Sequence, residues 1–129
     1  MEALQTVLTA YRAFLKQEID TCCARIARLE AAQRQDEANI EKVRRNIIGI
    51  FETLLAADEA CVKKTDQPTL AAFCDRFCPR FESLPASWRA RLETARAHGD
   101  PQTQLIEETK LATANSLWQA FQKTKEAAQ

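Results

Sequence analysis

The sequence of residues 19–61 is IDTCCARIARLEAAQRQDEANIEKVRRNIIGIFETLLAADEAC, in which apolar positions follow an alternating spacing of three and four residues. This spacing places side chains on one face of an α-helix, in the heptad pattern of a coiled-coil seam. The stretch has no proline and one glycine, and it is rich in strong helix formers. The seam positions that form our candidate interface are Ile19, Ile26, Leu29, Gln33, Asp36, Ile40, Val43, Ile47, Ile50 and Leu54.

Two seam positions, Gln33 and Asp36, are polar and leave two interpretations open. Polar residues within a seam fix register and oligomeric state, because only one alignment satisfies their hydrogen bonds. The residues between them include no Gly, Pro, Ser or Thr, and the heptad phase continues across them, so we favour one continuous helix over residues 2–63, about 90 Å long. The alternative is a helical hairpin that turns near Gln33 to Asp36, with Asp36 capping the second helix, which would give a compact four-helix-type bundle.

The composition of the whole chain predicts a single all-α domain, a helical bundle spanning residues 1–129. Of its 129 residues 46% are hydrophobic, which is enough for a core, and only two are glycine. A β-sandwich or a doubly wound sheet needs many more turn residues. The glycine-rich phosphate loops of nucleotide-binding enzymes and the GxSxG motif of hydrolases are missing from the sequence.

Four prolines mark the element boundaries of the second half of the chain. We expect a short helix over residues 67–78, which Pro79 ends, and a second over 85–98 that Pro85 opens and Gly99 terminates. The Asp100-Pro101 pair is typical of an N-cap followed by proline in the first turn. We therefore expect the last helix over residues 101–126.

Cys74 and Cys78 are the strongest local candidates for chemistry. They are four residues apart, so on a helix both thiols lie on one face and could bind a soft metal or form a redox pair. A structural zinc site needs four ligands, and the other cysteines and the single histidine, His98, are distant in sequence. We favour buried, reduced cysteines that fill space in the core, and we expect no metal and no cofactor.

The same part of the chain interleaves aromatic residues with arginines that form a possible surface for an anion or a partner: Arg76, Arg80, Arg89 and Arg91. Guanidinium groups beside aromatic rings could stack on bases or hold an anionic partner. The alternative, which we favour, is an amphipathic helix pair whose aromatics fill the core while the arginines remain in water. Because the net charge is zero and no continuous basic stripe is present, we do not expect a nucleic-acid partner.

No catalytic constellation is apparent. The residue three before His98 is Ala95, so the Glu-x-x-His pairs of di-iron bundles are missing. His98 is next to Gly99 and is expected to lie at a helix C-terminus, and the Asp58-Glu59 pair is expected on a solvated face. We therefore predict that the protein is not an enzyme.

The expected location is the cytoplasm, because the N-terminal residues lack the basic and apolar regions of an export signal. No apolar run approaches the roughly 20 residues that cross a membrane, so we expect no membrane partner. A continuous N-terminal helix would be too long for the later helices to cover, which leaves its seam for another chain. We therefore predict an interaction or scaffold protein that forms a homodimer, or that binds another helical protein, through this seam. The alternative is a compact bundle that binds a ligand, a metal or nucleic acid through residues 73–91.

Overall fold

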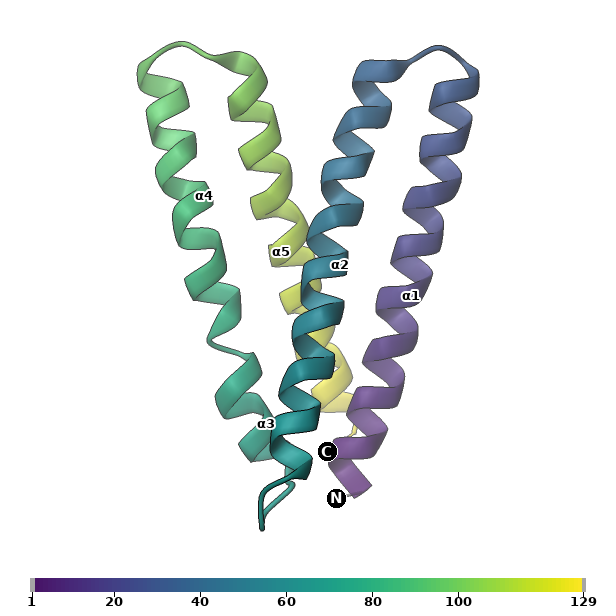
Figure 1. Cartoon of the computed structure of the whole chain (residues 1–129), viewed down its shortest axis with the longest axis vertical. Coiled ribbons are helices and arrows are strands. Elements are labelled where there is room, and N and C mark those ends of the chain that lie inside the picture. Colours follow the sequence, from purple (N-terminus) through teal and green to yellow (C-terminus); the bar gives the residue numbers. More distant parts are fainter. Residues whose placement is uncertain (1, 129) are drawn as a thin grey trace.

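The computed structural model describes residues 2–128 and confirms an all-α helical bundle. Two long hairpins, α1 with α2 and α4 with α5, meet at one end of the molecule and diverge toward their turns, and the short α3 lies at the end where they meet (Figure 1). None of these helices is long and apolar enough to cross a membrane. The helices are α1 (Glu2–Ala31), α2 (Gln35–Lys63), α3 (Leu70–Phe77), α4 (Arg80–Ala97) and α5 (Pro101–Ala127).

The chain reverses between α1 and α2, so the predicted continuous helix over residues 2–63 is wrong and the alternative hairpin is correct. Gln33 has a φ of 59°, in the left-handed region. The amide of Arg34 donates to the carbonyl of Leu29 at 2.8 Å, and the amide of Gln33 donates to the carbonyl of Glu30 at 3.0 Å. These two bonds make a Schellman motif, in which glycine usually takes the left-handed position. Because a glutamine takes it here, the sequence carries no visible turn signal.

Gln33 and Asp36 also do not occupy a seam. Both side chains are exposed, Gln33 in the turn and Asp36 in the first turn of α2. The N-cap of α2 is Arg34, whose guanidinium instead pairs with Glu37, so Asp36 is not the cap. A carboxylate in the first turn is still favourable, because it interacts with the positive end of the helix dipole.

The second hairpin turns by the same motif, this time with glycine. Gly99 has a φ of 64°, and the amide of Asp100 donates to the carbonyl of Ala95 at 2.9 Å. The Asp100 side chain accepts a hydrogen bond from the amide of Thr103 at 3.1 Å, and Pro101 is the first residue of α5. The predicted start of the last helix is therefore confirmed.

Helix α3 is shorter than the predicted range of 67–78. It begins after Thr69, whose hydroxyl oxygen accepts a hydrogen bond from the amide of Ala72 at 3.1 Å. The N-cap therefore lies one residue beyond Pro68, and the proline belongs to the preceding loop.

Helix α4 starts earlier than the predicted range of 85–98. Its N-cap is Pro79, and Pro85 lies inside the helix with its ring buried. A proline at this place removes the hydrogen bond to the carbonyl of Phe81, one turn earlier, and crowds that carbonyl, yet the helix continues through it.

The core is centred on the ring of Phe77, at the end of α3. Phe77 is fully buried, and so is Tyr11, whose hydroxyl donates to the carbonyl of Leu117 at 2.8 Å. The aromatic ring of Phe77 packs against aromatic rings of both hairpins, and these aromatic pairs join α3 to the hairpins. Its ring lies within 5.1–6.4 Å, between centroids, of Tyr11, Phe51, Phe73, Phe81 and Phe121.

Replacing Gln33 with glycine tests the first turn. We expect Gln33→Gly to raise the free energy of unfolding by about 0.5–1 kcal/mol, because glycine adopts a positive φ without steric cost. The measurement is urea unfolding followed by circular dichroism, with Gly99→Ala as the matched variant that should lose about 1 kcal/mol. A loss of stability in Gln33→Gly would contradict the turn, since glycine inside a continuous helix costs about 1 kcal/mol.

Candidate functional site

The predicted seam is divided by the hairpin into a covered part and an open part. Ile26 and Ile47 are buried between the helices, whereas Ile50 is 40% exposed. The other five apolar seam residues are all half-buried, namely Ile19, Leu29, Ile40, Val43 and Leu54. The hairpin therefore covers much of the seam within one chain. The prediction of a second chain, which rested on a long uncovered helix, no longer has that support.

The open part of the seam lines a shallow groove of about 520 Å³ that is built mainly by α2. Ile19 comes from α1, and Gly49, Ile50 and Leu54 come from α2, with Arg45 beside them. A Cβ atom added at Gly49 would meet no atom within 4 Å. No packing inside the chain therefore requires glycine here, although glycine within a helix costs about 0.5–1 kcal/mol relative to alanine.

One face of α2 that borders this groove, running from Asn46 to Ala60 beside Arg45, has no charged residue over four turns. Its residues are spaced three and four apart, which places them on one side of the helix. All of them are exposed except the half-buried Gly49. We call this surface the outer face of α2, and its residues are Asn46, Gly49, Ile50, Thr53, Ala56, Ala57 and Ala60.

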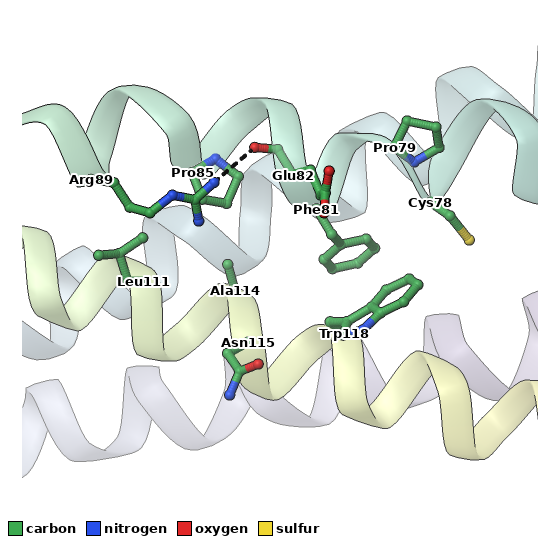
Figure 2. Close-up of a pocket in the computed structure, with 10 residues that line it drawn as sticks. All are labelled: Cys78, Pro79, Phe81, Glu82, Pro85, Arg89, Leu111, Ala114, Asn115 and Trp118. Carbon is green, nitrogen blue, oxygen red and sulfur yellow. Dashed lines mark hydrogen bonds between the residues drawn. The ribbon is translucent and has the colours of Figure 1, made fainter.

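A second groove, of about 840 Å³, lies between the start of α4 and the middle of α5 (Figure 2). Phe81 from α4 and Trp118 from α5 pack against each other in its floor, with ring centroids 5.1 Å apart. Leu111 and Pro85 continue its apolar lining, and the guanidinium of Arg89 donates to the carbonyl of Glu82 at 3.3 Å. Six of its ten lining residues belong to the predicted binding segment of residues 73–91, and the other four come from α5, which that prediction did not include.

Two of the four predicted surface arginines are engaged inside the chain. The carboxylate of Asp58 is fully buried, and Arg80 donates to it through two nitrogens, at 2.7 and 2.8 Å. Arg76 lies 3.7 Å from the same carboxylate. The expectation of a solvated face is therefore wrong for Asp58, which attaches α2 to the start of α4.

Within residues 2–128, no ion pair involves the other two arginines, Arg89 and Arg91, and both are exposed. Arg76 is also 50% exposed, but its charge is shared with Asp58. Only Arg89 lines the groove between α4 and α5, whereas Arg91 lies on another side of α4, near His98.

Cys74 on α3 and Cys78, the C-cap residue of α3, form a pair of half-buried free thiols. The hydrogen bond from Cys78 lowers the pKa of Cys74 to about 7, with help from the positive charge of Lys125. The same hydrogen bond and burial raise the pKa of Cys78. The pair thus contains one thiol that ionises easily and one that stays protonated.

The part of the chain that the structure describes has no cluster of three or more His, Cys, Asp or Glu side chains that could hold a metal ion. His98 is exposed and is the C-cap residue of α4. No protein-family model matches the chain, no curated protein is similar to it in sequence, and no solved structure matches its fold.

The contact between Asp58 and Arg80 predicts unequal effects of removing either partner. Arg80→Met leaves a carboxylate buried with only a distant cation, which should cost about 3 kcal/mol of stability. Asp58→Asn leaves an arginine that is 32% exposed and can turn to water, so we expect a cost of about 1–2 kcal/mol. Chemical denaturation of both variants checks this order, and equal losses would contradict it.

The ionisation of Cys74 predicts a distinct pH dependence of alkylation. Since only the thiolate reacts, the rate of iodoacetamide modification at Cys74 should rise with a midpoint near pH 7. Cys78→Ala removes the hydrogen bond that stabilises the thiolate and should move this midpoint upward. Site-resolved mass spectrometry measures both rates, with Lys125→Gln expected to give a smaller upward shift. An unchanged midpoint in Cys78→Ala would contradict the pairing of the thiols.

Proposed function

We propose that the protein is a non-enzymatic helical interaction protein that forms a homodimer through the outer face of α2. The observation that carries this proposal is an exposed helix face of four turns that has no charged residue and includes a large apolar side chain, Ile50, that is 40% exposed. In a chain with 28% charged residues, solvent-facing helix surfaces are expected to carry them. Five free cysteines are consistent with work in a reducing compartment, which we take to be the cytoplasm.

Charge complementarity favours a second copy as the occupant. Arg45 and Glu52 are seven residues apart, so they lie along one edge of the outer face of α2. Across the described residues, neither forms an ion pair with its own chain. If two copies of α2 pack antiparallel about a point next to Gly49, Arg45 of each copy lies opposite Glu52 of the other. A two-fold axis thus forms the same pair twice, as an isologous interface requires.

The open space at Gly49 fits the same arrangement. Packed helices approach to about 8–10 Å, and the smallest side chains at the crossing point permit the shortest distances. Gly49 lies at the centre of the proposed crossing, and Ile19 and Leu54 would border it. The predicted seam therefore contributes to the interface only through its open part, because Ile26 and Ile47 are buried within the hairpin.

The proposal predicts a charge-reversal pattern in solution mass. Light scattering after size-exclusion chromatography should give the wild-type chain a mass close to twice 14.6 kDa. Arg45→Glu and Glu52→Arg should each shift the mass toward the monomer, because like charges then meet twice across the interface. The double variant should restore the dimer. The control is Arg28→Glu, which makes the same charge change at an exposed position of α1.

Gly49→Gln provides a second arm that does not depend on charge. In the monomer the longer side chain enters open space and improves helix propensity, so the variant should be more stable than wild type when measured as a monomer. In the dimer it should obstruct the crossing and lower the mass. A monomeric wild-type chain, or a Gly49→Gln dimer as tight as wild type, would refute the proposed interface.

A further inference from the structure

We propose that the groove between α4 and α5 binds an amphipathic helix of a partner protein, which carries an acidic side chain at the position that meets Arg89. This surface is separate from the outer face of α2, since none of its lining residues comes from α1 or α2.

The shape of the groove fits a third helix. Phe81, Pro85 and Arg89 succeed one another at intervals of four along α4, and Leu111 and Trp118 are seven apart on α5. The two rows therefore run along about 10–12 Å, which is about two helical turns. A channel between two packed helices accepts a helix with apolar residues at positions i, i+3 or i+4, and i+7.

The floor of the groove offers the contacts that such a helix needs. Phe81 and Trp118 are only half-buried although both pack against the core, so one side of each ring faces the groove (Figure 2). Pro85, one turn after Phe81 on α4, is buried and fixed within that helix. Partly buried tryptophans on rigid elements are frequent centres of binding energy, because their large surface is held in place before binding.

Charge selects the kind of partner helix. The guanidinium of Arg89 hydrogen-bonds to the carbonyl of Glu82, and in the described part of the chain it meets no carboxylate within ion-pair distance. An acidic side chain on the partner would pair with this cation next to apolar surface, where water screens the interaction less than at a fully exposed site. The exposed carboxylate of Glu82 also lines the groove, so the preference concerns one position of the partner helix and not its overall charge. At the position that meets Arg89, an acidic side chain is favoured over a basic one.

The test uses two fluorescently labelled helical peptides that differ in one residue. Both carry leucines at i, i+3, i+4 and i+7, and one has a glutamate beside the leucine face where the other has a lysine. Fluorescence anisotropy with the full-length protein should show about fivefold tighter binding of the glutamate peptide. Arg89→Glu should reverse this preference, whereas Arg91→Glu, a matched change on the same helix outside the groove, should retain it. Trp118→Ala should weaken both peptides while the circular dichroism spectrum stays helical.

The outcomes separate this proposal from the homodimer. Arg45→Glu should leave peptide binding unchanged, and Arg89→Glu should leave the solution mass unchanged. Equal binding of the two peptides, equal effects of Arg89→Glu and Arg91→Glu, or no binding up to about 1 mM peptide would overturn the proposal. A fall in mass on Arg89→Glu would also overturn it, because a second copy of the chain would then occupy the groove.

Discussion

The ring of Phe77 is the contact on which the arrangement of the two hairpins depends. It meets an aromatic ring from each of the other four helices, and it lies at the end where the hairpins converge. α3 is only eight residues long and would not be stable as an isolated helix, so burial of this ring and that of Phe73 must hold it in place. Through Phe77, α3 joins two hairpins that are otherwise attached mainly by α2 and α5.

Away from the aromatic rings around Phe77 the hairpins separate, and the residues buried between their helices become more polar. Toward the turns, each hairpin buries a carboxylate in place of an aromatic ring. Glu41 pairs with Arg44 on α2, and Glu107 pairs with Lys110 at 3.0 Å on α5. A paired buried charge contributes little net stability compared with apolar packing of the same volume. The ends of the two hairpins near their turns should therefore have the lowest free energy of local opening.

Much of this fold can be predicted from local sequence signals. The low glycine content and the helix formers establish the all-α class, and Gly99 with Asp100-Pro101 locates the second turn. The first turn was predicted only as the alternative interpretation, because its left-handed residue is Gln33, which has no strong preference for that conformation. The unbroken heptad phase was misleading for a related reason, since two antiparallel helices that pack on each other both present apolar seams.

The residues of the candidate sites could be predicted from the sequence only where they recur at helical spacing along one helix. The open seam at Ile50 and the aromatic-arginine segment of α4 are both visible as patterns. Asp58 has no such signal, because its partner Arg80 is 22 residues away and an Asp-Glu pair usually marks a solvated surface. Trp118 was missed for the same reason, since it joins Phe81 only through packing of α5 on α4.

The distance between the two exposed native thiols, Cys23 on α1 and Cys61 on α2, tests the hairpin account most directly. Spin labels at these positions, with Cys22, Cys74 and Cys78 replaced by alanine, allow the distance to be measured by pulsed electron resonance. Arg25 lies 3.9 Å from Glu41, so Cys61 is displaced from Cys23 along the hairpin by about 25–30 Å. The account predicts a distance near 30 Å within one chain, measured after dilution with unlabelled protein. A distance near 57 Å, the length of one continuous helix between the two residues at about 1.5 Å per residue, would contradict it.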